Sequence, residues 1–158
     1  MIKILLLGAI SGFPWVLIGS SLSLWLKEDG LSRSTIGWAG LIFGVYAFNY
    51  LWAPLIDRLK IPYLTKKIGH RRAWIVLMQL IILISLFLWS LVSPDENLGF
   101  VISVGLIIAI ASATQDITVD ALRIEQINED EGKSMAAGAA MAVVGWWTGY
   151  KLGGVVAL

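Results

Sequence analysis

Long uncharged, apolar runs dominate this chain, and short polar segments separate them. A helix needs about 20 mostly apolar residues to cross the hydrocarbon core of a bilayer, and each run is close to that length. Strands of a membrane β-barrel would instead alternate between apolar and polar positions over about 10 residues, which these runs do not do. The pattern therefore predicts an all-α bundle of membrane-spanning helices at residues 4–26, 34–56, 73–93, 98–119 and 134–158.

Composition narrows the class of protein further. Hydrophobic residues make up 58% of the 158 positions and charged residues 15%, whereas a soluble domain has about 45–50% and about 25%. The net charge of +1 gives no electrostatic reason to expect a nucleic-acid partner. The chain has no cysteine, which removes disulfides, thiolate catalysis and cysteine–zinc sites. We therefore expect an integral membrane protein that is not an enzyme, with no cofactor and no metal ion.

Basic residues are distributed unevenly between the segments that join the predicted helices. Nine lysines and arginines lie in the N-terminus, the 57–72 loop and the 120–133 segment, against two in the 27–33 loop. Because cytoplasmic loops carry the excess of positive charge, we expect the N-terminus and the 57–72 loop to be cytoplasmic. No polar flank follows the last apolar run at Leu158, so we interpret the sequence as the N-terminal portion of a longer protein.

A polar stripe runs along the fourth predicted helix. At 100° per residue its members fall within an arc of about 80°: Ser112, Asp116, Asp120 and Arg123. Intramembrane carboxylates are costly and usually face a bundle interior or a cavity, so the stripe is either a gate or proton relay, or a structural lock between helices. Asp116 lies deeper and is the stronger functional candidate, whereas Asp120 and Arg123 are expected to form a structural pair.

The fifth predicted helix has two different faces. Small residues recur at four-residue spacing (Gly145, Gly149, Gly153 and Ala157), and such seams let helix backbones approach closely. Roughly opposite lie Trp147 and Lys151, with Tyr150 beside them. A cation beside aromatic faces suits an anionic, ring-bearing substrate in a cavity; the alternative is that Lys151 extends outward to the interface while the aromatic residues pack.

Two further polar residues, Asn49 and Gln79, lie in the middle of predicted helices. Such residues are typical of interhelical hydrogen bonds rather than ligand contacts. Asn49 is nevertheless kept as a candidate cavity residue.

The loop after the second predicted helix contains two charged motifs, Asp57-Arg58 and Gly69-His70-Arg71-Arg72. Together they resemble the signature loop of the major facilitator superfamily, Gly-x-x-x-Asp-Arg/Lys-x-Gly-Arg-Arg/Lys. Ala53 replaces the first glycine, and an insertion separates the two halves.

Three stretches also resemble the AmpG-type muropeptide permeases of that superfamily. They are Gly12-Phe13-Pro14, residues 51–58 with the Gly-x-Arg-Arg-x-Trp that follows them, and residues 112–121. The last contains the run Gln-Asp-Ile-x-x-Asp-Ala, which is the most specific of the three. The resemblance covers all five predicted helices.

The resemblance implies a fold and an activity. The fold is the N-terminal half of a twelve-helix facilitator bundle, of which five helices are present. The activity is proton-driven import of GlcNAc-anhydroMurNAc, with or without stem peptide, across the inner membrane for cell-wall recycling. It also implies that Asp57, Arg58, Arg71 and Arg72 hold a cytoplasmic gate closed, and that Asp116 and Asp120 are charge-relay or proton-linked carboxylates.

Other functions remain open from the sequence. Acetyl-CoA transporters share similar segments, so another small anionic solute is an alternative substrate. A non-transporting fragment or regulatory protein is a second alternative, because five helices cannot enclose a substrate path. An intramembrane enzyme with Asp116 and Asp120 as metal ligands is a third, but the Asp-Gly-x-x-Ala-Arg motif of CDP-alcohol phosphotransferases is missing.

Overall fold

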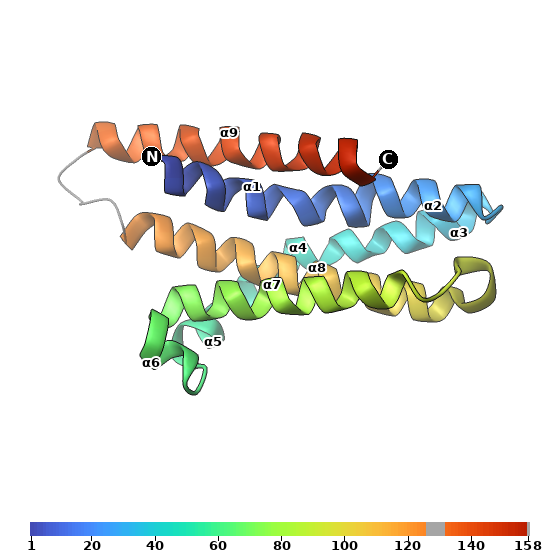
Figure 1. Ribbon diagram of the computed structural model, residues 1–158, viewed down its shortest axis with the longest axis horizontal. Coiled ribbons are helices and arrows are strands. Elements are labelled where there is room, and N and C mark those ends of the chain that lie inside the picture. The colour runs from blue at the N-terminus through green and yellow to red at the C-terminus, as the bar shows by residue number, and fades with distance from the viewer. Residues whose placement is uncertain (126–131, 158) are drawn as a thin grey trace.

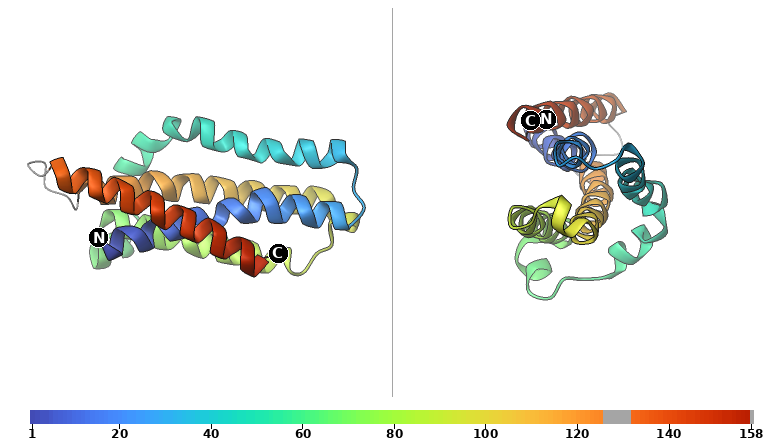
Figure 2. Two further views of the ribbon diagram at one scale, coloured as in Figure 1. Left: turned by 90° about the horizontal axis from the view of Figure 1, so that it is seen from above. Right: turned by 90° about the vertical axis from the view of Figure 1, so that its right-hand side faces the viewer.

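The computed structural model describes residues 1–125 and 132–157, and within them every regular element is helical. The long helices run nearly along one axis and form an elongated bundle (Figures 1 and 2). This architecture confirms the predicted all-α class. Among the described residues, three continuous helical stretches are long and apolar enough to cross a membrane: Ile2–Glu28, His70–Trp89 and Pro94–Glu125.

The first of these stretches consists of α1 (Ile2–Val16), the π-helical turn η1 (Leu17–Ser21) and α2 (Leu22–Glu28). The second is α7 (His70–Trp89), and the third is α8 (Pro94–Glu125), which bends at Asn97, where φ is −142° and ψ is 57°. The last helix, α9 (Gly132–Ala157), lies against α1 (Figure 1). The region predicted at 134–158 corresponds to α9, apart from Leu158, which lies outside the described residues, and its membrane crossing stays a prediction.

The region predicted as the second span is a series of short helices rather than one regular helix. Its segments are α3 (Arg33–Ala39), η2 (Gly40–Phe43), α4 (Gly44–Phe48), η3 (Asn49–Leu51) and α5 (Ala53–Arg58). Pro54 explains the last break, because it has no N–H to donate to the carbonyl four residues earlier and disfavours the helical conformation of the residue before it. The 34–56 span also stays a prediction.

A short helix, α6 (Leu64–Ile68), joins the second region to α7. Gly69 has a φ of 91° at the junction, a conformation that glycine adopts without steric cost. This turn places His70 and Arg71 beside the end of α5. We call this end of the bundle, with the 57–72 loop and the C-terminal end of α8, the basic end.

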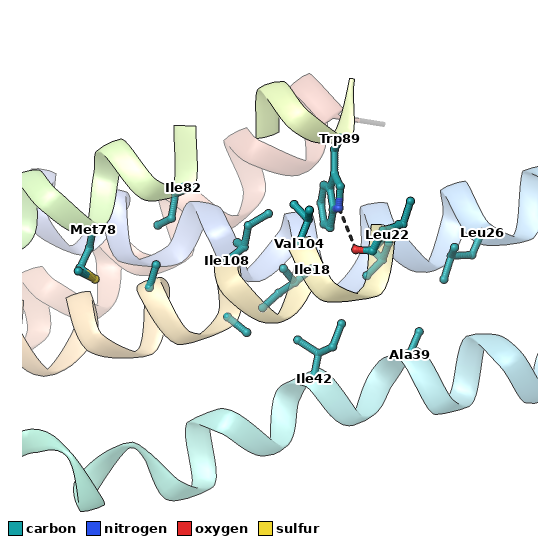
Figure 3. Close-up of a cluster of buried hydrophobic side chains, with 13 residues drawn as sticks. Ile18, Leu22, Leu26, Ala39, Ile42, Met78, Ile82, Trp89, Val104 and Ile108 are labelled. Atoms are coloured by element: carbon teal, nitrogen blue, oxygen red, sulfur yellow. Dashed lines mark hydrogen bonds between the residues drawn. The ribbon is translucent and has the colours of Figure 1, made fainter. Parts of the chain in front are cut away.

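The main apolar core lies between the α1–η1–α2 stretch, η2, α7 and α8 (Figure 3). Ile18 and Leu22 belong to this core together with Ile42 and Ile108. The one polar atom of Trp89 is satisfied, because its indole N–H donates to the Val101 carbonyl at 3.0 Å. Outside this core many large apolar side chains are exposed, including Leu83, Phe87 and Val155. An apolar exterior of this extent fits a bundle surrounded by lipid or by further helices.

The closest helix–helix contact in the described bundle joins α1 to α9, and glycines on both helices make it. A Cβ atom at Gly145 would lie 2.1 Å from the Leu5 carbonyl oxygen, and one at Gly149 would lie 2.0 Å from that of Ala9. The predicted packing role of the α9 seam is therefore confirmed at these two positions. Gly153 also meets side chains of α1, whereas the side chain of Ala157 lies outside the described residues.

The glycines of α1 that take part in this contact were not predicted from the sequence. A Cβ at Gly8 would lie 2.3 Å from the Ala142 carbonyl oxygen, and one at Gly12 would lie 2.0 Å from that of Trp146. The two backbones thus touch on both sides, and a methyl group at any of the four positions would push the helices apart.

We expect Gly149→Ala to destabilise the protein in detergent, by about 1–3 kcal/mol, because the new methyl group would overlap backbone atoms of α1. The measurement is the thermal unfolding midpoint of the purified protein. Gly37→Ala, in α3, is the matched control, since nothing lies within 4 Å of a Cβ there. Equal midpoints for the two variants would contradict the proposed importance of the α1–α9 contact.

Candidate functional site

Asp116 is a partly buried carboxylate on α8, in the interior of the bundle. Its Oδ2 atom accepts a hydrogen bond from the indole N–H of Trp15 on α1, at 3.5 Å. Its Oδ1 atom is buried and has no hydrogen-bond partner among the described residues. A buried carboxylate with a free oxygen is costly when ionised, so this position favours a proton, a water molecule or a ligand group at Oδ1.

Three hydroxyl groups near Asp116 are also buried without partners in the described structure. They belong to Ser11 on α1, Tyr46 on α4 and Ser112 on α8. Ser11 lines the same cavity as Asp116, and the Tyr46 hydroxyl faces Ser112 and Asp116. Buried polar groups are normally satisfied, and clusters of unsatisfied ones need an explanation. Hydroxyls that donate and accept would suit bound water or the polar groups of a ligand.

A cavity of about 340 Å³ opens between α1, α8 and α9 beside this cluster. Asp116, Asp120 and Arg123 line it from α8, and Trp146 lines it from α9. Arg123 Nη2 lies 3.0 Å from Asp120 Oδ1, which is the pair that the sequence predicted. The predicted polar stripe thus reaches a cavity in the volume range of small-molecule sites, about 300–1,000 Å³.

A cluster of aromatic rings continues from this cavity across four elements, α1, η2, α4 and α9. The Trp15 ring lies 4.3 Å from that of Tyr46, 5.2 Å from that of Phe43 and 5.7 Å from that of Trp146, between centroids. Trp146 in turn stacks on Tyr150 at 5.4 Å. We call these residues the aromatic wall: Trp15, Phe43, Tyr46, Trp146 and Tyr150.

Of this wall, only Tyr150 was predicted from the sequence as a cavity residue. Trp15, Phe43 and Tyr46 were missed because they lie on two segments whose contact no local pattern shows. One signal was available: Trp15 follows Ser11 by one helical turn, on a single face in the middle of an apolar run.

The other predicted cavity residues are arranged differently. Tyr150 contacts η1 through a 3.2 Å hydrogen bond between its hydroxyl and that of Ser20. Trp147 packs edge-on against Trp146 and Tyr150 but is 52% exposed, and Lys151 is exposed and belongs to none of the ion pairs among the described residues. Asn49 is half-buried in η3. Trp147, Lys151 and Asn49 are not among the residues that line the cavity beside Asp116. Their proposed role in binding, like that of Tyr150, stays a prediction.

The basic end is held together by one arginine. Arg71, at the start of α7, forms ion pairs with Asp57 at the end of α5 and with Glu125 at the end of α8, the latter at 2.9 Å. Its side chain is 18% exposed, whereas both carboxylates are more than half exposed. Arg58 and Arg72 are exposed and make no ion pair with a described residue. Of the four predicted gate residues, the structure therefore joins Asp57 and Arg71, and it adds Glu125, which was missed.

Other polar residues inside the bundle have structural partners. Gln79 donates to Gln115 Oε1 at 2.6 Å, and Gln115 donates to the Ile10 carbonyl at 3.1 Å, which links α7, α8 and α1. This confirms the interhelical hydrogen bond predicted for Gln79. Trp52 likewise donates to Thr114 Oγ1 at 3.0 Å. No cluster of three or more metal-ligating side chains occurs within the described ranges.

Comparison with known proteins gives a consistent result. The sequence pattern that defines the Major Facilitator Superfamily matches residues 4–158. The chain is 32% identical over 155 residues to the anhydromuropeptide permease of Escherichia coli K12, which covers 98% of the chain and 30% of the relative. It is 34% identical over 158 residues to AmpG 4 of Rickettsia felis, covering all of the chain and 37% of the relative. The chain thus spans about a third of the length of these relatives, and no solved structure matches it.

We expect double-mutant cycles at the basic end to show that Arg71 is coupled to both acidic partners. Asp57→Asn and Glu125→Gln, each combined with Arg71→Ala, should give coupling energies of about 0.2–1 kcal/mol in unfolding, because the carboxylates are partly exposed. Coupling should decrease as salt is raised. Arg72→Ala is the control variant, because Arg72 forms no ion pair with a described residue. Zero coupling of Arg71 to both Asp57 and Glu125 at low salt would show that the two ion pairs contribute nothing to stability.

Proposed function

This chain belongs to the major facilitator superfamily, and on that premise we propose that it works as a proton-coupled transporter that imports anhydro-muropeptides across the inner membrane for cell-wall recycling. The relatives' names supply the substrate class, since one is an anhydromuropeptide permease and others carry the name AmpG. The position of Asp116 is the single observation that carries the coupling mechanism.

Charge inside a membrane is costly, and this cost is the basis for the proposed coupling of transport to protons. An ionised carboxylate inside a span is costly by about 2.5–3.5 kcal/mol on insertion scales. At Asp116 one oxygen has a single long hydrogen bond and the other has no partner among the described residues. Protonation would remove this charge, so the state of Asp116 that lets the helices rearrange is the neutral one. The proton would then be released to the cytoplasm when the cavity opens inward.

Substrate binding is assigned to the cavity and the aromatic wall. The apolar faces of the sugar rings would lie on Trp15, Trp146 and Tyr150, whose ring contacts already form a continuous surface. The substrate's hydroxyl and amide groups would reach the unpartnered hydroxyls beside Asp116. Lys151, Trp147 and Asn49 are proposed to line the path on the side facing further helices, where Lys151 would meet the anionic part of the substrate.

The ion pairs of the basic end are proposed to form the cytoplasmic gate. Arg71 joins the ends of three helical regions through Asp57 and Glu125, so these regions must separate, or carry the pairs with them, when the path opens inward. The relatives are about three times as long as this chain. We propose that a second set of helices completes the path and that the two halves rock about the site.

The coupling proposal predicts the behaviour of Asp116→Asn. In vesicles that contain the complete protein, uptake of labelled GlcNAc-anhydroMurNAc should depend on an inward proton gradient. Asp116→Asn should remove most of the gradient-driven uptake while membrane insertion stays intact, because an amide cannot bind and release the proton. Asp95→Asn, in the first turn of the same helix, is the control and should transport normally.

Three results would contradict parts of this proposal. Uptake that ignores the proton gradient in the wild type would exclude the coupling. Wild-type uptake by Asp116→Asn would assign Asp116 a structural role. Transport of an anionic solute such as acetyl-CoA, with no uptake of the disaccharide, would replace the substrate while leaving the facilitator mechanism in place.

The charge bias predicts the orientation, and the lack of cysteine makes it testable. A single cysteine at Lys60, in the basic loop, should react with an impermeant maleimide only after the membrane is permeabilised, because we place this loop in the cytoplasm. A cysteine at Asp29, in the loop after α2, should react in intact cells. Both positions are exposed in the structure, so the reverse pattern would invert the topology.

A further inference from the structure

Trp15 belongs to the aromatic wall and also contacts the Asp116 carboxylate. Its indole N–H donates to Asp116 Oδ2 across 101 positions of sequence. Its ring packs on Tyr46, Phe43 and Trp146, which come from α4, η2 and α9. A change in the hydrogen bond at one end of this side chain would therefore move or loosen the surface at the other end.

The hydrogen bond is sensitive to the protonation state of its acceptor. An N–H donor bonds to an ionised carboxylate about twice as strongly as to a neutral acceptor. At 3.5 Å the Trp15–Asp116 contact is longer than the usual N–H···O distance of about 2.7–3.2 Å, so it is weak and a small helix movement is enough to tighten or break it. A proton added at Oδ1, the oxygen without a partner in the described structure, would turn the carboxylate into a neutral acid and weaken the hold on Trp15.

The groups around Asp116 leave few rivals as the titrating site. On its own helix Asp120 and Arg123 face the same cavity but are paired with each other. Tyr46 faces it from α4, α7 presents Gln79 to Gln115 next to it, and α1 contributes Ser11 and Trp15. From α9 the cavity receives Trp146 and small or apolar residues. Asp116 is thus the acid in direct contact with the wall.

We propose that Trp15 is a positioning residue that couples the protonation of Asp116 to the binding of sugar rings on the aromatic wall. The proposal rests on the proposed function. In the ionised state Asp116 holds the indole by its N–H. In the protonated state the indole is released from the carboxylate and settles on the sugar, so substrate and proton bind together. Linkage requires the reciprocal effect, in which bound sugar favours the protonated acid.

The test compares substrate affinity at acidic and mildly alkaline pH. Calorimetry on the complete purified protein would measure binding of GlcNAc-anhydroMurNAc. One linked proton changes the wild-type affinity by up to about tenfold per pH unit. Trp15→Phe keeps an aromatic ring but has no N–H, so it should still bind at acidic pH while its pH dependence falls below about twofold per unit. Asp116→Asn should likewise bind with little dependence on pH.

Trp52→Phe is the matched control. Trp52 also donates its indole N–H to α8, at Thr114 Oγ1, but it does not touch the carboxylate. This variant should keep the wild-type pH dependence. A second variant separates ring shape from hydrogen bonding. Benzothienylalanine in place of Trp15 keeps the fused ring but has no N–H. It should lose the pH dependence as Trp15→Phe does, which would show that the smaller phenyl ring is not the cause.

The possible results discriminate between the two proposals. If the wild type binds no disaccharide at either pH, the proposed substrate is wrong. If the wild type binds with a clear pH dependence and the Trp15 variants keep it, the proposed function stands and the Trp15 link is overturned. Loss of pH dependence in Trp52→Phe as well would also overturn the link, because any disturbance of α8 would then suffice.

Discussion

The contact between α1 and α9 is the constraint on which the rest of the structure depends. Four glycines let the two backbones touch, with no room for a side chain at any of them. Because α1 also packs on α8, this contact fixes the distance of both helices from α9. The cavity beside Asp116 and the approach of Trp146 to Trp15 follow from that spacing. A wider contact would separate the aromatic rings and open the buried hydroxyls to lipid or water.

Polar groups within the bundle fall into two classes. Gln79, Gln115 and Trp52 are satisfied by neighbouring helices, so they hold helices in register. Asp116 and the hydroxyls around it are left partly or wholly unsatisfied in the described structure. In a medium without water such groups persist only where they serve another purpose. The presence or absence of hydrogen-bond partners therefore distinguishes structural polar residues from those of the candidate site more clearly than polarity alone.

The charged groups also fall into two classes, which differ in their exposure to water. At the basic end, carboxylates that are more than half exposed pair with Arg71 where water and ions weaken the attraction. Such contacts are easily broken, which suits the proposed cytoplasmic gate. Asp116 is shielded from that screening, so its protonation state has a larger effect on its neighbours. In the proposed mechanism, a weak lock at the surface and a sensitive acid inside would be complementary parts.

The sequence by itself determined the helical class, because apolar runs of this length have no other stable form in a membrane. It also determined the α9 seam and the Asp120–Arg123 pair, since both are set by periodicity within one helix. Only the tertiary structure decided that Trp15 meets Asp116 and that Arg71 meets Glu125, across 101 and 54 positions. It also broke the second predicted helix into segments and left Lys151 exposed, outside the lining of the cavity beside Asp116. Periodicity shows which residues share a face, whereas the neighbour of that face is chosen by packing among all the helices at once.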